Sequence, residues 1–77
     1  MKKYMLISVC EREIETLQTD TLEEAQERML RELKEFGGVE SPAIGMEGPD
    51  YEIDEMSAWS NVKEDIKQDW LIVELEQ

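Results

Sequence analysis

The residues of this chain that can carry chemistry are its 20 carboxylates and two tryptophans, because the 77 residues include no histidine and one cysteine, Cys10. Without histidine, Ser-His-Asp and Cys-His nucleophile systems are excluded, as are metal sites that use imidazole. One cysteine also excludes a zinc site built from several thiolates. All four glycines follow the predicted helix, so no glycine-rich strand-to-helix turn is available for a phosphate or a dinucleotide. The sequence therefore predicts a protein that is not an enzyme and has no cofactor and no metal.

The segment Asp50 to Asp54 has acids at every second position, as the first half of a calcium loop does. A calcium loop has glycine at its sixth place and a bidentate glutamate at its twelfth, whereas this chain has Glu55 and Asn61 there. The pattern therefore favours a solvated acidic strand over a cation site.

The acids concentrate in the second half of the chain. Gly37 to Gln77 holds 11 acidic residues against Lys63 and Lys67, a balance of −9 within a net charge of −12. Such a field attracts basic surfaces and repels nucleic acid and lipid headgroups. Carboxylates can replace phosphates in the basic groove of a nucleic-acid-binding protein, and a tryptophan can anchor the interface. The predicted partner-binding residues are Asp50, Glu52, Asp54, Glu55, Trp59, Glu64, Asp65 and Asp69.

These residues are expected to lie in one α+β domain, residues 1–77. Thr21 and Glu24 form a capping box before an apolar helical stripe that Gly37 and Gly38 end. The alternation that begins at Tyr51 slips near Glu55, where we expect a bulge or a strand end. The predicted elements are strands at about 3–10, 13–19, 50–58 and 69–76, a helix at about 22–36 and a long loop at 37–50. The order β-β-α-β-β fits a four-stranded, mostly antiparallel sheet with one helix packed on one face.

The first and last strands are apolar on both sides, which is typical of strands that are covered on both faces. We expect Leu22, Met29, Leu30, Leu33 and Phe36 of the helix to pack against Met5, Ile7, Val9, Leu71 and Val73. The other sheet face then needs a cover, either the loop at 37–50, the segment around Trp59 or a second copy of the chain. The dimer face in the last case is Tyr4, Leu6, Trp70 and Ile72.

The tail EMSAWSN at 55–61 with DWLIVE at 69–74 resembles that of short uncharacterised acidic proteins of Firmicutes and of their phages and mobile elements. In general character, being small, acidic and without catalytic residues, the chain is similar to anti-CRISPR inhibitors, which occupy nucleic-acid channels of Cas nucleases. The lone cysteine fits a reducing compartment, and no segment approaches the roughly 20 apolar residues of a membrane span. We therefore expect a cytoplasmic protein.

Two functional hypotheses follow from these features. The first is a non-enzymatic inhibitor or nucleic-acid mimic that binds a basic protein, such as a Cas nuclease, and does not itself bind nucleic acid or membranes. The alternative is a small structural or regulatory homodimeric module whose acidity serves solubility only.

Overall fold

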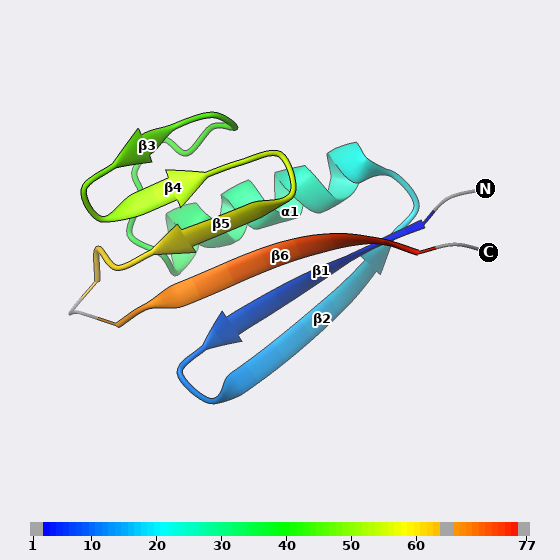
Figure 1. The fold of residues 1–77 in the computed structure, drawn as a ribbon, viewed down its shortest axis with the longest axis horizontal. Helices are drawn as coiled ribbons and strands as arrows, with labels where there is room; N and C mark the ends of the chain where they lie inside the picture. Colours follow the sequence, from blue (N-terminus) through cyan, green and yellow to red (C-terminus); the bar gives the residue numbers. More distant parts are fainter. Residues whose placement is uncertain (1–2, 64–65, 76–77) are drawn as a thin grey trace.

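The computed structural model describes residues 3–63 and 66–75, which form an antiparallel sheet with a helix on one face (Figure 1). The elements are β1 (Lys3–Cys10), β2 (Glu13–Thr19), α1 (Leu22–Glu35), β3 (Glu47–Gly48), β4 (Tyr51–Ile53), β5 (Ser57–Ser60) and β6 (Gln68–Leu75). The strand order is β2-β1-β6-β5-β4-β3, so the first and last described strands pair with each other in the interior of the sheet. The α+β class is confirmed, but the described part of the chain has six strands where four were predicted.

The two additional strands come from the region between the helix and the last strand. The predicted strand at 50–58 is in fact a hairpin, because the chain reverses after Ile53 and returns as β5. The backbone N–H of Asp54 donates to the carbonyl of Ser57 at 2.7 Å and closes the turn. The slip of alternation near Glu55 therefore marks a strand end. β3 lies inside the predicted loop, where Glu47 and Gly48 pair with Glu52 and Tyr51.

The helix begins and ends where its capping residues predict. The Thr21 hydroxyl oxygen accepts a hydrogen bond from the backbone N–H of Glu24 at 3.1 Å. At the other end, Gly38 has a φ of 78°, which lets the chain leave the helix axis. A Cβ atom on Gly37 would lie 2.9 Å from the carbonyl oxygen of Leu33 and 3.1 Å from the Trp70 ring, so only glycine fits this close approach.

The core lies between α1 and one face of the sheet. Its buried residues are Leu6, Ala25, Met29, Leu33, Val39, Ile53, Ala58, Trp70 and Ile72, and Tyr4, Leu22 and Leu30 pack against them. The predicted choice of sheet face is therefore wrong. Met5, Ile7, Val9, Leu71 and Val73 alternate with the core residues of β1 and β6, so they point away from the helix.

The same finding corrects the predicted dimer face. Leu6, Trp70 and Ile72 are buried under α1, and Tyr4 packs against this core, so these residues offer no surface to a second chain. Phe36 is also misplaced by the prediction, because it follows the last helical residue and is 57% exposed.

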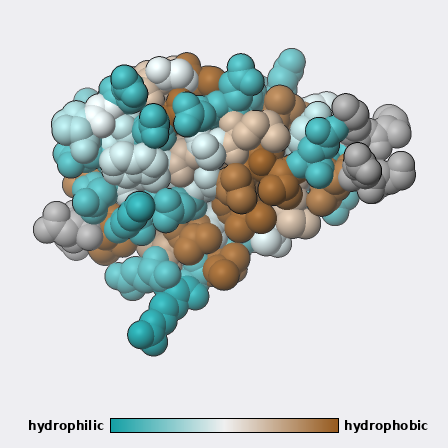
Figure 2. Space-filling model, viewed as in Figure 1, coloured by the Kyte–Doolittle hydropathy of each residue, from teal (hydrophilic) through white to brown (hydrophobic). Residues whose placement is uncertain are grey.

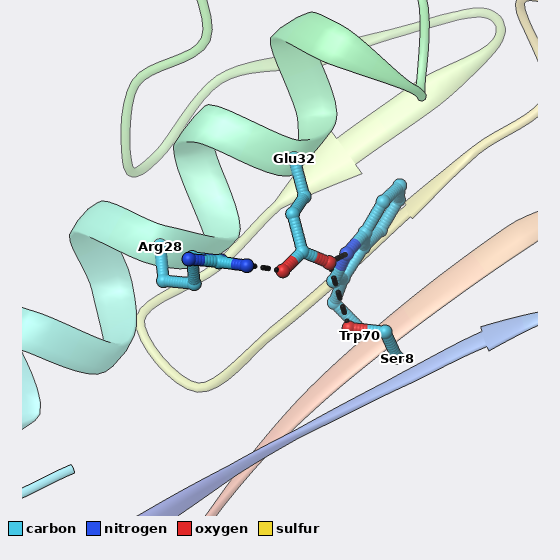
Figure 3. A network of polar contacts seen from close by, with 4 residues as sticks. All are labelled: Ser8, Arg28, Glu32 and Trp70. Atoms are coloured by element: carbon cyan, nitrogen blue, oxygen red, sulfur yellow. Dashed lines mark hydrogen bonds and ion pairs between the residues drawn. The ribbon is translucent and has the colours of Figure 1, made fainter. Parts of the chain in front are cut away.

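A polar network explains why this sheet face meets the helix (Figure 3). Oε1 of Glu32 accepts hydrogen bonds from the Ser8 hydroxyl at 2.9 Å and from the Trp70 indole N–H at 3.1 Å. Oε2 of Glu32 pairs with Nε of Arg28 at 2.9 Å. The carboxylate thus joins α1 to both β1 and β6, and the side chain of Glu32 is only 12% exposed. A face without Ser8 and Trp70 would leave this carboxylate without these two donors.

The ends of β5 and β6 contribute to the same attachment. Buried Ser60 donates its hydroxyl to the carbonyl of Gly37, and the side-chain amide of Gln68 donates to the carbonyl of Phe36 at 2.7 Å. Both carbonyls follow the last helical residue and lack partners within the helix. Polar residues of the sheet therefore hold the helix end against β5 and β6.

Leu33→Ala should lower the free energy of unfolding by about 2 to 4 kcal/mol, because Leu33 is fully buried and its loss leaves a cavity. Phe36→Ala, at an exposed position, should cost less than about 1 kcal/mol. Urea denaturation followed by circular dichroism measures both values. Equal losses for the two variants would contradict the observed core.

Glu32→Ala should lower the free energy of unfolding by about 2 kcal/mol or more, because it leaves the buried indole N–H of Trp70 without its acceptor. Glu35→Ala, on the exposed side of the same helix, is the matched control and should change stability by less than about 0.5 kcal/mol. Comparable midpoints for Glu32→Ala and the unaltered protein would show that the network adds nothing to folding.

Candidate partner-binding face

The sheet face turned away from α1, here called the open face, carries the candidate site. Of the three covers expected for the second sheet face, the loop at 37–50 lies on the helix side instead. Val39 is buried in the core, and its backbone N–H donates to the carbonyl of Leu33 at 3.1 Å. Met46, further along the loop, packs against the same core. The segment around Trp59 is itself a strand of the sheet, so it extends the open face and does not cover it.

One row of directly paired residues crosses the open face, with one member from each strand. Register pairs join Ile14 to Val9, Val9 to Asp69, Asp69 to Trp59, Trp59 to Glu52 and Glu52 to Glu47. Residues that are directly opposite in antiparallel strands share a sheet face. The row therefore changes from apolar at β2 and β1 to acidic and aromatic at β6, β5, β4 and β3. Its acidic part, here called the acidic row, consists of Asp69, Trp59, Glu52 and Glu47.

The acidic row combines carboxylates with an aromatic ring that already holds a cation. The indole N–H of Trp59 points to Oε2 of Glu52 at 3.4 Å, which confirms that both side chains lie on one face. The Lys67 ammonium lies 5.9 Å from the centroid of the Trp59 ring, within cation–π range. Glu47 stands directly opposite Glu52, and like charges in this position destabilise a sheet. The arrangement suits the binding of a lysine or arginine from another molecule.

Three of the predicted partner-binding residues meet in the acidic row, namely Glu52, Trp59 and Asp69. Asp50 is exposed in the turn between β3 and β4. Asp54 and Glu55 are exposed in the turn between β4 and β5, and the Glu55 carbonyl accepts from the side chain of Gln26 in α1 at 2.9 Å. The turn thus leans toward the helix, away from the row. Glu64 and Asp65 lie outside the described residues.

Glu47 is a member of the site that sequence reasoning missed, because it fell inside the predicted loop. The signal was present in the sequence Gly48-Pro49-Asp50, which is typical of a tight turn between two paired segments. Pairing the residues on either side of that turn brings Glu47 opposite Glu52.

An apolar patch adjoins the acidic row on β2, β1 and β6. Its members are Met5, Ile7, Val9, Ile14, Leu71 and Val73. Ile14 is 67% exposed and Leu71 is 47% exposed, whereas the other four are half-buried by their neighbours in the sheet. Figure 2, in the orientation of Figure 1, shows hydrophobic side chains gathered near the middle of this face and hydrophilic ones around them. The apolar patch and the acidic row form one continuous surface, because Val9 of the patch is directly paired with Asp69 of the row.

A concavity on the helix side of the sheet has a volume of about 270 Å³. Cys10, Glu13, Glu15 and Phe36 contribute to its lining, together with Glu32, whose carboxylate is already engaged by Ser8, Trp70 and Arg28. Among the described residues, no group of three or more cysteine or acidic side chains is placed to hold a metal ion. The same part of the chain has no helix with the length and apolar content needed to cross a membrane.

Glu47→Gln should raise the free energy of unfolding by about 0.2 to 1 kcal/mol, because it removes the like charge opposite Glu52. Glu40→Gln, an exposed loop substitution with the same change in charge, should have a smaller effect. The difference between the variants should shrink at about 0.5 M NaCl, as screening weakens exposed charge pairs. Thermal denaturation at two salt concentrations measures it, and a destabilised Glu47→Gln protein would refute the repulsion.

Comparisons with known proteins add no family to this description. No protein-family model matches the chain, and neither a curated protein nor a solved structure does. The resemblance of the tail to acidic proteins of Firmicutes and their phages therefore stays an expectation. The features that bear on function are those of the molecule itself, above all the acidic row on a sheet face that residues 3–63 and 66–75 leave uncovered.

Proposed function

We propose that this chain is a non-enzymatic binding protein that acts on a basic nucleic-acid-binding protein and competes with nucleic acid for its basic surface. The observation that carries the proposal is the acidic row, in which Glu52 and Asp69 flank Trp59 and Glu47 lies beyond Glu52, on a sheet face that no described segment covers. A Cas nuclease is the first candidate partner, through the similarity in general character to anti-CRISPR inhibitors. The single cysteine fits action in the cytoplasm.

The geometry supports a cationic partner in two ways. The three carboxylates extend over β3, β4 and β6, a width of about 14 Å at the usual spacing of strands. They also lie on the same face of the sheet, where several basic side chains of one surface can reach them together. Lys67 over Trp59 shows that the ring can accommodate an ammonium group. Charge of this kind raises the association rate and selects against acidic competitors.

The net charge of −12 makes nucleic acid itself an unsuitable ligand. Phosphates would be repelled by the acidic row, whereas the arginine- and lysine-lined channel of a nucleic-acid-binding protein would be attracted to it. Binding should therefore block the channel, and its affinity should fall as salt rises.

The test immobilises the protein as bait in a bacterial lysate and compares two triple variants that each remove three negative charges. One neutralises the acidic row with Glu47→Gln, Glu52→Gln and Asp69→Asn. The matched control neutralises exposed acids elsewhere with Glu27→Gln, Glu35→Gln and Glu40→Gln. The unaltered protein and the control variant should each retain a basic nucleic-acid-binding protein, and added duplex DNA should release it. The amount of this partner retained by the acidic-row variant should be lower by at least about tenfold.

Equal retention by the two triple variants would show that overall charge, and not the acidic row, is responsible. Direct binding of duplex DNA by the purified protein would also refute the proposal. A partner that is retained equally well in the presence of excess DNA would be bound somewhere other than its nucleic-acid channel.

A further inference from the structure

We propose that the apolar patch and the acidic row together form one docking surface for an amphipathic helix of the partner, with basic residues along one flank of that helix. The inference rests on the proposed function and specifies the part of the partner that is bound. It predicts a contribution to affinity that does not depend on charge.

The apolar patch is the first reason for expecting more than an electrostatic contact. Six apolar side chains from three adjacent strands point away from α1, and no described segment covers them. Leu71 on β6 is 47% exposed, with Ile7 directly opposite on β1, the middle strand of the three. Contiguous apolar surface on a small soluble protein is typical of an interaction site. Removing it from water would contribute to affinity in proportion to the area buried.

The opposite face of the same sheet shows which kind of element fits. There, α1 packs on β1, β2 and β6 with a stripe formed by Ala25, Met29 and Leu33, spaced at i, i+4 and i+8. The apolar patch occupies the same three strands on the open face. A second helix placed on it would cover the second face of the sheet as α1 covers the first. The natural occupant is therefore a helix with a stripe of large apolar residues.

The acidic row determines which residues one flank of that helix should carry. It lies beyond β6, beside the apolar patch, because Asp69 separates Val9 from Trp59 in the register. A helix lying along β1 and β6 would direct one flank toward Asp69, Trp59 and Glu52. Lysine and arginine can lay their apolar stems on the patch while their charged ends reach these groups. Lys67 already occupies the Trp59 ring and would be displaced by, or would compete with, an incoming cation.

Charge complementarity favours this partner over a second copy of the chain. Each copy carries −12, and two open faces in contact would bring two acidic rows into one interface. The described cations near this face do not balance them, since Lys3 pairs with Asp20 at 3.6 Å and Lys67 lies over Trp59. A basic amphipathic helix neutralises the row and covers the patch at the same time.

The experiment uses two synthetic helical peptides of about 18 residues as probes, measured by calorimetry against the full chain at about 0.05 M and about 0.5 M NaCl. One peptide has leucine on one face and lysine on the rest, and the other has serine in place of leucine with the same charge. The leucine peptide should bind more tightly and lose at most about tenfold in affinity at the higher salt. The serine peptide should lose nearly all of its binding.

Variants then locate the binding on the open face. Leu71→Thr combined with Ile14→Thr should weaken the leucine peptide by at least about fivefold while leaving the serine peptide unchanged, since threonine keeps the strand propensity. The control is Leu17→Thr, which alters a similarly exposed leucine, 39%, whose register partner Leu6 faces the helix. Lys67→Gln should strengthen binding of both peptides more than Lys63→Gln, which makes the same charge change in the same connection. Denaturation midpoints confirm that each variant folds.

The outcomes separate this inference from the proposed function. Equal affinity for the two peptides would overturn the helix-docking inference and leave the acidic binding function standing. Equal losses in Leu71→Thr/Ile14→Thr and Leu17→Thr would also overturn it, because the patch would not be the site. A dimer in sedimentation that Leu71→Thr dissociates would assign the patch to a second copy instead. No binding of either peptide at low salt would overturn both proposals.

Discussion

In the part of the chain that the structure describes, a helix of 14 residues covers one face of a six-stranded sheet and leaves the other open, and the rest of the structure depends on this contact. The Glu32 carboxylate of the helix accepts hydrogen bonds from Ser8 of β1 and Trp70 of β6. These bonds hold the helix against the sheet face that carries Ser8 and Trp70. A carboxylate that is mostly withdrawn from water is tolerated only with donors and a countercharge nearby, and Glu32 has both. Once the helix is held there, the side chains of alternate residues are left facing outward. The open face is thus a consequence of the contacts that build the core.

How far the sequence predicts the fold depends on the kind of signal each element offers. The hairpin β1–β2 and the helix follow from strand-forming runs, a capping box and two terminal glycines, which are local features. The hairpin β4–β5 was read as one strand because its turn, Asp54 to Met56, contains no glycine, proline or asparagine. The choice of sheet face failed for a different reason. β1 and β6 have apolar residues on both sides, so alternation alone cannot distinguish the faces. The contact that decides between them, Ser8 with Glu32, joins residues 24 positions apart and leaves no local signal in the sequence.

The candidate site could be predicted only in part, because some of its features are local in the sequence and others depend on how the strands pair. Alternation within one strand placed Glu52 outward correctly, but bringing it together with Trp59 and Asp69 requires the register of three strands. Register is a long-range property that composition does not determine. The asymmetry of charge along the chain nevertheless indicated the half of the sequence that contains the acidic row. What it did not reveal is that the acids adjoin an apolar surface, and this changes the expected partner from a purely basic groove to an amphipathic element.

The two tryptophans stand on opposite faces of the same sheet, Trp70 buried and bonded to Glu32, Trp59 half-buried beside Glu52. The pairs Ala58–Trp70 and Trp59–Asp69 are consecutive in the register of β5 and β6. The two indole rings are therefore close along the strands but lie on opposite sides of the sheet. The two tryptophans are therefore intrinsic fluorophores in two different environments. Emission from Trp70 reports on the integrity of the interior, and emission from Trp59 reports on contact at the outer face. Replacing one indole ring by phenylalanine leaves a single tryptophan, so that under excitation selective for tryptophan, unfolding and complex formation can be followed as independent signals without any attached dye.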